Sequence, residues 1–280
     1  MKIAQIVCVF PPYRGGIGNA AYNFALELAR LNNEVTVFTP ARSQQRANFS
    51  GFNFIELSPF LYYGNGAFLP QLFGRLKNFD IVHLHYPFFG GAELVWFSKI
   101  LGQAGKKLVI HYHMDIQDLP ALAKILSLPD YFIRKSLFVR AEAITCASLD
   151  YLKNSQIRKL YQQMSAKFME IPFGVDSERF KPNSNWLQQK NNILFVGSLD
   201  RAHSFKGLNV LLDSLVLLKK EIKLTVVGGG DLLAQYQAQV EKRQIQARVN
   251  FAGAVAEEEL PNFYQHADLL VLPSLNAHEA

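Results

Sequence analysis

Short apolar, β-branched runs alternate with helical stretches along almost the whole chain. In the first part, seven such runs lie at residues 3–10, 34–38, 54–57, 81–84, 108–111, 143–146 and 168–171. Between the first two runs, residues 19–31 repeat apolar side chains at the spacing of one helical face. Wholly apolar strands that alternate with helices are typical of a parallel sheet covered on both sides. We therefore expect a doubly wound α/β fold.

The alternation starts again at residue 193. Strand-like runs lie at 193–196, 224–227, 249–252 and 269–272, with helical patterns at 207–219, 231–243 and 257–266. Residues 176–192 between the two series are polar and poor in aliphatic side chains, as in a linker. The sequence predicts two Rossmann-like domains, 1–175 and 193–280, joined by linker 176–192. A ligand would then lie beyond the carboxyl ends of the strands, in the cleft between facing domains.

Composition excludes several classes of protein. With 49% hydrophobic and 19% charged residues, the chain can bury a core and is neither disordered nor a coiled coil. No window reaches about 18 uncharged apolar residues, and the apolar start breaks at Pro11, so we expect no membrane span and no signal peptide. Cys8 and Cys146 lie in apolar runs. Two such thiols indicate buried side chains in a reducing, cytosolic setting.

The net charge of +6 is uneven along the chain. Residues 1–190 hold 21 Lys and Arg against 13 Asp and Glu, or +8, whereas residues 191–280 hold 8 against 10, or −2. A basic half could face a phosphorylated substrate or an anionic membrane leaflet, or carry a solvated surface. Basic runs never exceed two residues and no nucleic-acid motif is present, so we expect no nucleic-acid partner.

A glycine-rich loop follows the first strand. Gly15, Gly16 and Gly18 precede a helix, where backbone N–H groups can approach a phosphate closely. Gly16-x-Gly18-x-x-Ala21 matches a dinucleotide fingerprint, but it starts too far from the strand, and Thr39-Pro40 stands where a ribose-binding acid belongs. We predict a phosphate or sugar loop, with a merely tight turn as the alternative.

Two histidine pairs lie at strand ends, His83 with His85 and His111 with His113. A zinc site would need a third and a fourth ligand, and neither a cysteine pair nor an H-E-x-x-H motif supplies them. Structural or substrate-contacting roles are therefore favoured over metal binding. Because strand ends line the ligand cleft, His113 and Asp115 are the polar site candidates.

The second domain opens with a strand that ends at Gly197, a turn that contains Arg201 and Lys206, and a helix. Such a turn can hold a diphosphate, with cations that match its charge and N–H donors from the backbone. The glycines 228–230 repeat the pattern one strand later. Two glycine turns at strand ends favour a nucleotide site, with solvated loop charges as the alternative.

Several motifs taken in order resemble the retaining GT-B glycosyltransferases of family 4, which use nucleotide-diphosphate sugars. The resemblance rests on the Gly15-Gly16 loop, His113, Ile171-Pro-Phe-Gly-Val-Asp176 followed by Phe180 and Pro182, Phe195-Val-Gly197, Lys206-Gly207, Val227-Gly-Gly-Gly-Asp231, Phe251-Ala-Gly253, Ala267-Asp-Leu-Leu-Val-Leu-Pro273-Ser274 and Glu279-Ala280. Each motif alone is weak, and their joint order is specific.

The resemblance implies roles for these residues. Gly15 and Gly16 would lie against the donor phosphates and sugar, and His113 would contact the transferred sugar. Gly197 and Gly229 would bind the donor, and Lys206 would neutralise its diphosphate. Ser198 stands where the family usually has arginine, and we expect Arg201 to replace it.

The resemblance also implies an E-x7-E motif. Glu279 would be its first acid and would grip donor-sugar hydroxyls. The second, ribose-binding acid would fall beyond residue 280, so we expect the second domain to be incomplete here.

The implied chemistry is glycosyl transfer with retention, in which the leaving phosphate draws off the acceptor proton. Neither metal nor cofactor is expected. The acceptor would be a saccharide or a lipid-linked precursor in polysaccharide or cell-envelope synthesis. The enzyme would be cytoplasmic and peripheral at the inner face of the membrane. Aromatic clusters at 60–63, 88–89 and 96–97 could be core, a sugar platform or a membrane contact.

Three alternatives stay open from the residues. A non-catalytic nucleotide-sugar-binding module would bind a donor without turnover. A nucleotide-sugar epimerase of the same fold would release an isomerised sugar. A nicotinamide oxidoreductase would bind NAD, which the position of the glycine loop disfavours.

Overall fold

The computed structural model describes residues 1–13, 15–42, 49–116, 121–182 and 191–275. The chain divides into two compact units, Met1–Phe173 (unit 1) and Gly174–Glu279 (unit 2). Each unit contains its own parallel sheet and its own hydrophobic core.

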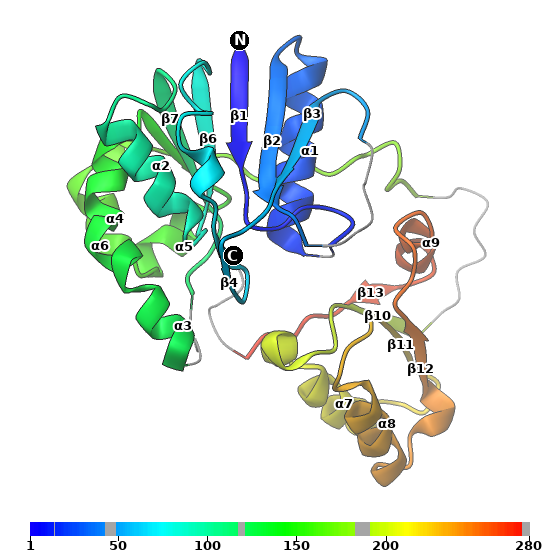
Figure 1. The fold of residues 1–280 in the computed structure, drawn as a ribbon. Coiled ribbons are helices and arrows are strands. Elements are labelled where there is room, and N and C mark those ends of the chain that lie inside the picture. Colours follow the sequence, from blue (N-terminus) through cyan, green and yellow to red (C-terminus); the bar gives the residue numbers. More distant parts are fainter. Residues whose placement is uncertain (14, 43–48, 117–120, 183–190, 276–280) are drawn as a thin grey trace. The chain divides into compact units, whose positions relative to one another are not determined.

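Unit 1 is built on a seven-stranded sheet in which all neighbouring strands are parallel. The sheet order is β3 (Asn53–Leu57), β2 (Glu34–Pro40), β1 (Lys2–Ile6), β6 (Ile81–Tyr86), β7 (Lys107–Tyr112), β8 (Ala143–Cys146) and β9 (Phe168–Glu170). The chain adds β2 and β3 on one side of β1, then crosses to add β6 on the other (Figure 1). Ligands of doubly wound folds bind beyond the carboxyl ends of the strands at such a reversal. The predicted α/β class is confirmed.

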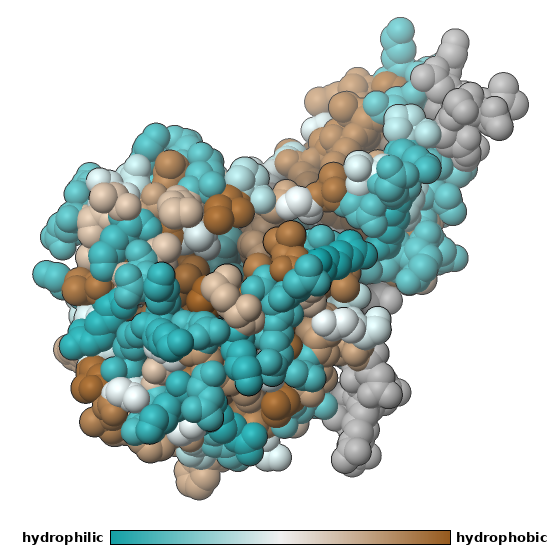
Figure 2. Space-filling view, turned by 90° about the horizontal axis from the view of Figure 1, so that it is seen from above, coloured by the Kyte–Doolittle hydropathy of each residue, from teal (hydrophilic) through white to brown (hydrophobic). Residues whose placement is uncertain are grey.

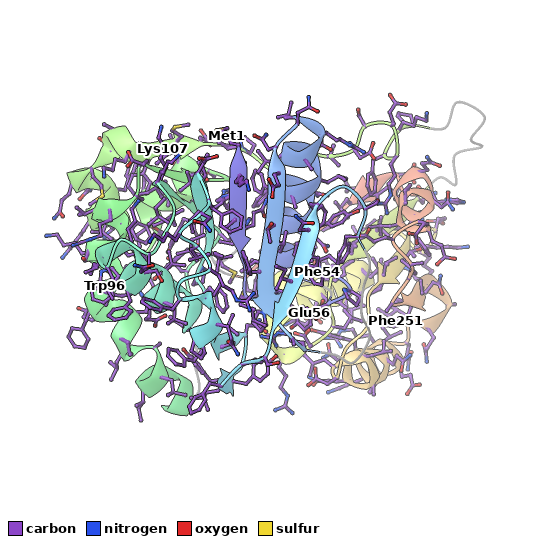
Figure 3. The ribbon with its side chains drawn as sticks, turned by 45° about the horizontal axis from the view of Figure 1, so that its top comes forward. Met1, Phe54, Glu56, Trp96, Lys107 and Phe251 are labelled. Carbon is purple, nitrogen blue, oxygen red and sulfur yellow. The ribbon has the colours of Figure 1, made fainter. Side chains whose placement is uncertain are left out.

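Helices cover both faces of this sheet. On one face, α1 (Gly16–Arg30) packs Ala21 and Ala25 against β1 and β2. The other face is covered by α2 (Gly91–Ile100), α4 (Leu128–Arg140), α5 (Leu149–Asn154) and α6 (Arg158–Gln163). The indole N–H of Trp96, labelled in Figure 3, donates to Ser136 Oγ at 2.9 Å and so joins α2 to α4. The short helix α3 (Ala121–Leu126) precedes α4.

Charged residues gather where the strands of unit 1 begin. Asp80 accepts hydrogen bonds from the main-chain N–H of Lys2 and from the ammonium of Lys106, both at 2.9 Å. Met1 and Lys107 mark this edge in Figure 3. Figure 2 looks onto it from above and shows hydrophilic residues interspersed with hydrophobic ones. Exposed ion pairs stabilise a fold little. Ligands of this fold bind beyond the carboxyl ends of the strands, so the functional groups are to be sought at the opposite edge.

A small hairpin departs from the predicted elements. β4 (Leu61–Tyr63) and β5 (Gly66–Phe68) pair antiparallel, and the short helix η1 (Pro70–Leu72) follows. Strands of three residues are too short to give a readable period. Phe60 at the start of the hairpin is exposed, whereas Phe88 and Phe89 are buried. The aromatic clusters therefore divide between surface and core.

Unit 2 has a four-stranded parallel sheet in the order β12 (Val249–Gly253), β11 (Lys223–Val227), β10 (Asn192–Val196) and β13 (Leu269–Leu270). Its helices are α7 (Leu208–Leu217), α8 (Leu233–Lys242) and α9 (Leu260–Gln265) (Figure 1), with the short helical turns η3 (Arg201–Lys206) and η4 (Gln246–Arg248). The turn η2 (Ser165–Lys167) belongs to unit 1. Four leucines of α7 lie in the core of unit 2, namely Leu208, Leu211, Leu212 and Leu215.

Several predicted boundaries were wrong. The helix predicted over 207–219 ends at Leu217 as α7, and Leu218 within the predicted range has extended backbone and is 39% exposed. β1 stops at Ile6, although residues 7–10 are buried too. The run at 269–272 forms a strand of two residues only. Burial and regular pairing are separate properties, and an apolar run reports mainly burial.

The cysteines behave as predicted from their neighbours. Cys8 and Cys146 are buried free thiols, and burial raises the pKa of each to about 11. A thiol with such a pKa is protonated and unreactive at neutral pH. In the described part of the chain, no helix is long and apolar enough to cross a bilayer.

Candidate functional site

The loop between β1 and α1 places the first glycines at the start of a helix. Gly15 is the N-cap of α1 with extended backbone, and Gly16 is its first residue. A Cβ on Gly16 would meet no atom within 4 Å, whereas one on Gly18 would lie 3.1 Å from the carbonyl oxygen of Val9. Gly18 thus allows α1 to pack closely on the chain after β1. The N–H groups at the start of α1 are of the kind that bind anions.

Arg42 is a cation that the sequence analysis missed. It follows β2, and its guanidinium lies over the ring of Tyr13 at 5.6 Å and over that of Tyr62 at 5.4 Å. It also donates to the carbonyl oxygen of Gly64 at 3.3 Å. Its position two residues after a strand end was the available signal, because strand ends line ligand sites in this fold.

The histidine pairs form one buried group under α1. His83 and His85 of β6, His111 at the end of β7 and His113 just after it make up what we name the histidine cluster. The centroids of neighbouring imidazole rings in this cluster lie 4.5–6.4 Å apart. The Phe24 ring of α1 lies against three of the four imidazoles. The expectation of wholly apolar strands is therefore wrong for this face of β6 and β7.

The cluster is tied together by hydrogen bonds. His85 Nδ1 lies 2.9 Å from His113 Nε2, and His111 Nδ1 lies 2.8 Å from Thr145 Oγ1. The His113 ring stacks on Phe173 with centroids 5.8 Å apart and planes 18° apart. His113 therefore sits at the carboxyl edge of the sheet, as predicted, with its ring position set by neighbours on both sides.

Burial keeps these imidazoles neutral. It lowers the pKa of His83 to about 3 and that of His111 to about 4, and it holds the pKa values of His85 and His113 well below the ordinary range. A neutral imidazole has one N–H donor and one acceptor nitrogen. His113 can therefore donate a hydrogen bond to a hydroxyl, but it does not supply charge at neutral pH.

Asp115, predicted as a polar site residue, has its carboxylate hydrogen-bonded to neighbouring groups of the protein. Its carboxylate accepts from the hydroxyl of Tyr112 and from the main-chain N–H of Gln156 at 3.0 Å. Its own N–H donates to the hydroxyl of Tyr151 at 2.8 Å. These bonds hold the segment after β7 against the segment after α5.

In unit 2, the two glycine turns pack backbone against backbone. The N–H of Leu199 donates to the carbonyl oxygen of Gly229 at 3.0 Å, and the N–H of Gly197 donates to Val227 at 3.0 Å. A Cβ on Gly230 would lie 2.3 Å from the carbonyl carbon of Leu199. Only glycine, which has no Cβ, permits this approach, so the turns after β10 and β11 form one joined surface.

Lys206 and Arg201 occupy the two ends of η3. The stem of Lys206 lies on Gly197, since a Cβ there would be 2.9 Å from Lys206 Cδ. Arg201 is 87% exposed, and its Nε lies 3.6 Å from Asp231 Oδ2. Lys206 is thus fixed beside the first glycine turn, while Arg201 reaches from its other end into solvent.

The start of η3 carries an interaction that the sequence analysis missed. Asp200 caps η3 by accepting from the N–H of His203 at 2.9 Å, and it also contacts His203 Nδ1 at 2.7 Å. This arrangement fixes the backbone between Gly197 and Lys206. Asp followed three residues later by His was the signal in the sequence.

A second buried polar group, which we name the acidic group, lies between α2 and α4. Asp130 is fully buried and accepts from the hydroxyl of Tyr86 at 2.6 Å and from Arg134 at 2.9 Å. Glu93 accepts from the N–H of Gly90 at 2.6 Å, and burial raises the pKa of its carboxyl to about 7. Because Tyr86 and Asp130 are 44 positions apart in the sequence, spacing alone did not reveal this group.

Glu279 lies outside the described residues, so its role stays a prediction. Among the described residues, no three His, Cys, Asp or Glu side chains come together so that they could hold a metal ion.

Comparison with protein families gives two adjoining matches. Residues 14–179 match the family described as Glycosyltransferase Family 4, and residues 176–280 match Glycosyl transferases group 1. The two matches meet near the boundary between the compact units.

Curated relatives are similar over most of this chain. A GDP-mannose-dependent alpha-(1-6)-phosphatidylinositol monomannoside mannosyltransferase of Mycolicibacterium smegmatis is 25% identical, over 94% of this chain and 70% of the relative. An alpha-monoglucosyldiacylglycerol synthase of Streptococcus pneumoniae is 24% identical, over 98% of this chain and 66% of the relative.

Solved structures share the fold. Sucrose-phosphate synthase from Thermosynechococcus elongatus has a TM-score of 0.70 at 18% identity, over 100% of this chain and 77% of that one. Anabaena Alr3699/HepE in complex with UDP-glucose has a TM-score of 0.70 at 16% identity, over 98% of this chain and 74% of that one. The expected GT-B fold is confirmed.

Proposed function

The chain belongs to glycosyltransferase family 4, and from this premise we propose that it transfers a hexose from a nucleotide-diphosphate sugar to a saccharide or lipid-linked acceptor, with retention of anomeric configuration. The observation that carries the donor assignment is the joined surface of the two glycine turns with Lys206 beside it. Backbone N–H groups and a cation next to a wall without side chains suit a diphosphate.

Each unit supplies different groups in this proposal. In unit 2, Gly197 and Gly229 give the donor diphosphate close access to the backbone, and Lys206 and Arg201 supply positive charge. In unit 1, Gly15 and Gly16 open the start of α1 to the phosphates and sugar. His113 donates its N–H to a hydroxyl of the transferred sugar, and Glu279 grips another.

The proposed step breaks the bond between the anomeric carbon and the diphosphate oxygen and forms a bond from that carbon to the acceptor oxygen. The proton of the acceptor hydroxyl goes to the leaving diphosphate on the same face. The diphosphate gains charge as it departs, so Lys206 and the turn N–H groups stabilise the transition state more than the ground state. In this scheme the protein needs no metal and no cofactor.

A donor panel tests the function. The chain is incubated with UDP-glucose, GDP-mannose and ADP-glucose, with and without a diacylglycerol or monosaccharide acceptor, and the products are followed by NMR of the anomeric proton. Transfer or donor hydrolysis that gives the same anomeric configuration as the donor supports the proposal. Binding without turnover would instead indicate a binding module, and a free isomerised sugar an epimerase.

We further propose that the enzyme is cytoplasmic and contacts the anionic inner face of a membrane through α3 and α4. Tyr131 and Phe132 are 70% and 76% exposed, and Ile125 and Leu128 near them are exposed too. Among the described side chains of α3 and α4, the exposed charged ones are all basic, namely Lys124, Lys135 and Arg140. Apolar side chains flanked by cations suit an interface with anionic lipid. The names of both relatives above contain a glycolipid, phosphatidylinositol monomannoside in one and monoglucosyldiacylglycerol in the other, which supports this reading.

Vesicle flotation tests the membrane contact. The chain should float with vesicles that contain phosphatidylglycerol and stay behind with vesicles of phosphatidylcholine alone. The double variant Tyr131→Ser/Phe132→Ser should lose flotation. Leu217→Ser, at a side chain that is 87% exposed on unit 2, is the matched control and should leave flotation unchanged. Equal flotation of all three proteins would exclude this surface.

A further inference from the structure

Gln5 of β1 inserts its side chain into the backbone of α1. Its amide lies between the carbonyl oxygen of Ala21 and the N–H of Ala25, at 3.1 and 3.0 Å. These two main-chain groups assign the amide orientation, because the oxygen must face the N–H of Ala25 and the NH₂ group must face the carbonyl of Ala21. Gln5 is fully buried, so water cannot substitute for either partner.

The same NH₂ group fixes the protonation of His85. It lies 3.0 Å from His85 Nε2 and donates to it, so that nitrogen is an acceptor. A neutral imidazole then carries its proton on the other nitrogen. His85 Nδ1–H therefore donates to His113 Nε2 across 2.9 Å.

The constraint continues to His113. Because Nε2 accepts from His85, the proton of His113 resides on Nδ1. Among the described residues, Nδ1 of His113 has no hydrogen-bond partner, whereas the ring itself is held between His85 and Phe173. Among the described residues, the rings next to His113 are those of His85, His111 and Phe173, and the titratable groups that act on it are the His111 and His83 imidazoles.

We infer that Gln5 and His85 are positioning residues that hold His113 in the Nδ1–H tautomer, so that it presents a single N–H donor to a hydroxyl of the donor sugar. The series of hydrogen bonds runs from the α1 backbone through Gln5 and His85 to His113, and in each bond the donor and the acceptor are fixed by the bond before it. The part that concerns the sugar rests on the proposed function. The tautomer itself does not.

The first test is NMR of the chain labelled with ¹⁵N-histidine at neutral pH. Long-range ¹H–¹⁵N correlations distinguish a protonated ring nitrogen from an acceptor one. His85 and His113 should both show a protonated Nδ1 and an acceptor Nε2. A protonated Nε2 on His113 in the unsubstituted chain would overturn the inference, and this result does not depend on any variant or on activity.

The second test removes the Gln5 amide, with which this series of hydrogen bonds begins. Gln5→Met keeps an unbranched side chain of similar length without the amide, so His85 and His113 should become mixtures of both tautomers. Thr145→Val is the matched control, because it removes the partner of His111 and should leave His113 unchanged. A single Nδ1–H tautomer of His113 in Gln5→Met would show that Gln5 does not position it. If that variant fails to fold, the measurement on the unsubstituted chain still decides.

Binding separates this inference from the proposed function. UDP-glucose, GDP-mannose and ADP-glucose are compared with UDP, GDP and ADP by calorimetry. Gln5→Met should weaken the sugar nucleotide that the chain binds by about fivefold to tenfold, the effect of one neutral hydrogen bond, and leave the corresponding nucleoside diphosphate unchanged. Equal weakening of both would overturn the contact with the sugar. If the unsubstituted chain binds no nucleotide, the proposed function fails while the NMR result stands.

Discussion

The Cα of Gly228 lies against the carbonyl oxygen of Gly197, so closely that a Cβ on Gly228 would stand 1.9 Å from that oxygen. The φ angle of Gly228 is +147°, which L side chains rarely adopt. Two strand ends that are 31 positions apart in the sequence are thereby joined at the place where we put the donor diphosphate.

We expect Gly228→Ala to separate the two turns and abolish donor binding, while Gly229→Ala should leave the turns joined and only weaken donor binding, through the Cβ that it adds to the donor-binding backbone. A Cβ on Gly229 would lie 3.4 Å from the Cβ of Ala254, which is a tight but tolerable contact. Calorimetry with nucleoside diphosphates measures the difference, and circular dichroism checks that both variants fold. Equal binding by the two variants would mean that the approach of Gly228 to Gly197 does not shape the site.

Lys206→Ala should lower turnover by about 10²-fold to 10³-fold, as for loss of one group that stabilises transition-state charge. Arg201→Ala should cost less, because its side chain is 87% exposed and its ion pair with Asp231 is long at 3.6 Å. Lys220→Ala, at an exposed lysine elsewhere in unit 2, is the control for a general loss of positive charge. Turnover of Lys206→Ala close to that of the control would remove Lys206 from the mechanism.

The sheets could be predicted from the sequence because apolar runs of four to eight residues report burial directly. The runs at 81–84 and 108–111 did mark β6 and β7, yet their histidines looked like exceptions at strand ends. The histidine cluster exists because parallel register sets His85 opposite His111 and α1 covers them. Register between strands 26 residues apart is not encoded in local spacing.

The hydrogen-bond partners of single polar residues were harder still to predict. Gln5 looks like one polar interruption in an apolar strand, and only the insertion into α1 explains it. Glu93 and Asp130 are 37 positions apart, and each looks like an ordinary first-turn acid of a helix. Local sequence shows the helix start, whereas the burial of these carboxyls depends on how α2 packs on α4.

The neutral histidine cluster should make unit 1 sensitive to acid. The pKa of His83 is about 3 in the folded chain, below the ordinary value of 6.5, so the unfolded state binds more protons as the pH falls below 6.5. Stability is therefore complete above pH 6.5 and is lost below it, by about 1.4 kcal/mol per pH unit for each such residue. His83→Leu should remove one such contribution between pH 6 and 4. The free energy of unfolding is followed through Trp96 fluorescence in a Trp186→Phe background, which leaves one of the two tryptophans.

Glu93 should make the folded state less stable as the pH rises, the opposite of the effect of the histidine cluster. Burial raises the pKa of its carboxyl to about 7 from 4.5, so the folded state binds more protons between these values and stability falls as the pH rises from 4.5 to 7. Glu93→Gln keeps an acceptor for the N–H of Gly90 but does not titrate. Above pH 7.5 the variant should be more stable than the unsubstituted chain by about 3 kcal/mol, and near pH 4.5 the two should agree. A constant difference across this range would mean that Glu93 is not buried as described.

Asp130 and Arg134 should be coupled strongly, because the carboxylate is fully buried and Arg134 donates to it through both Nε and Nη2, at 3.1 and 2.9 Å. Asp130→Asn leaves the guanidinium without a counter-charge and should lower the free energy of unfolding of unit 1 by about 3 kcal/mol. Arg134→Met leaves the carboxylate uncompensated and should cost a similar amount. The double variant should cost clearly less than the sum of the two, with a coupling of at least about 1 kcal/mol. Denaturant titrations monitored by Trp96 fluorescence measure all three variants, because Trp96 of α2 contacts Ser136 of α4, the helix that contains Asp130 and Arg134. If the two costs simply add, the pair does not act as a unit, and the bond from Tyr86 alone would account for the burial of Asp130.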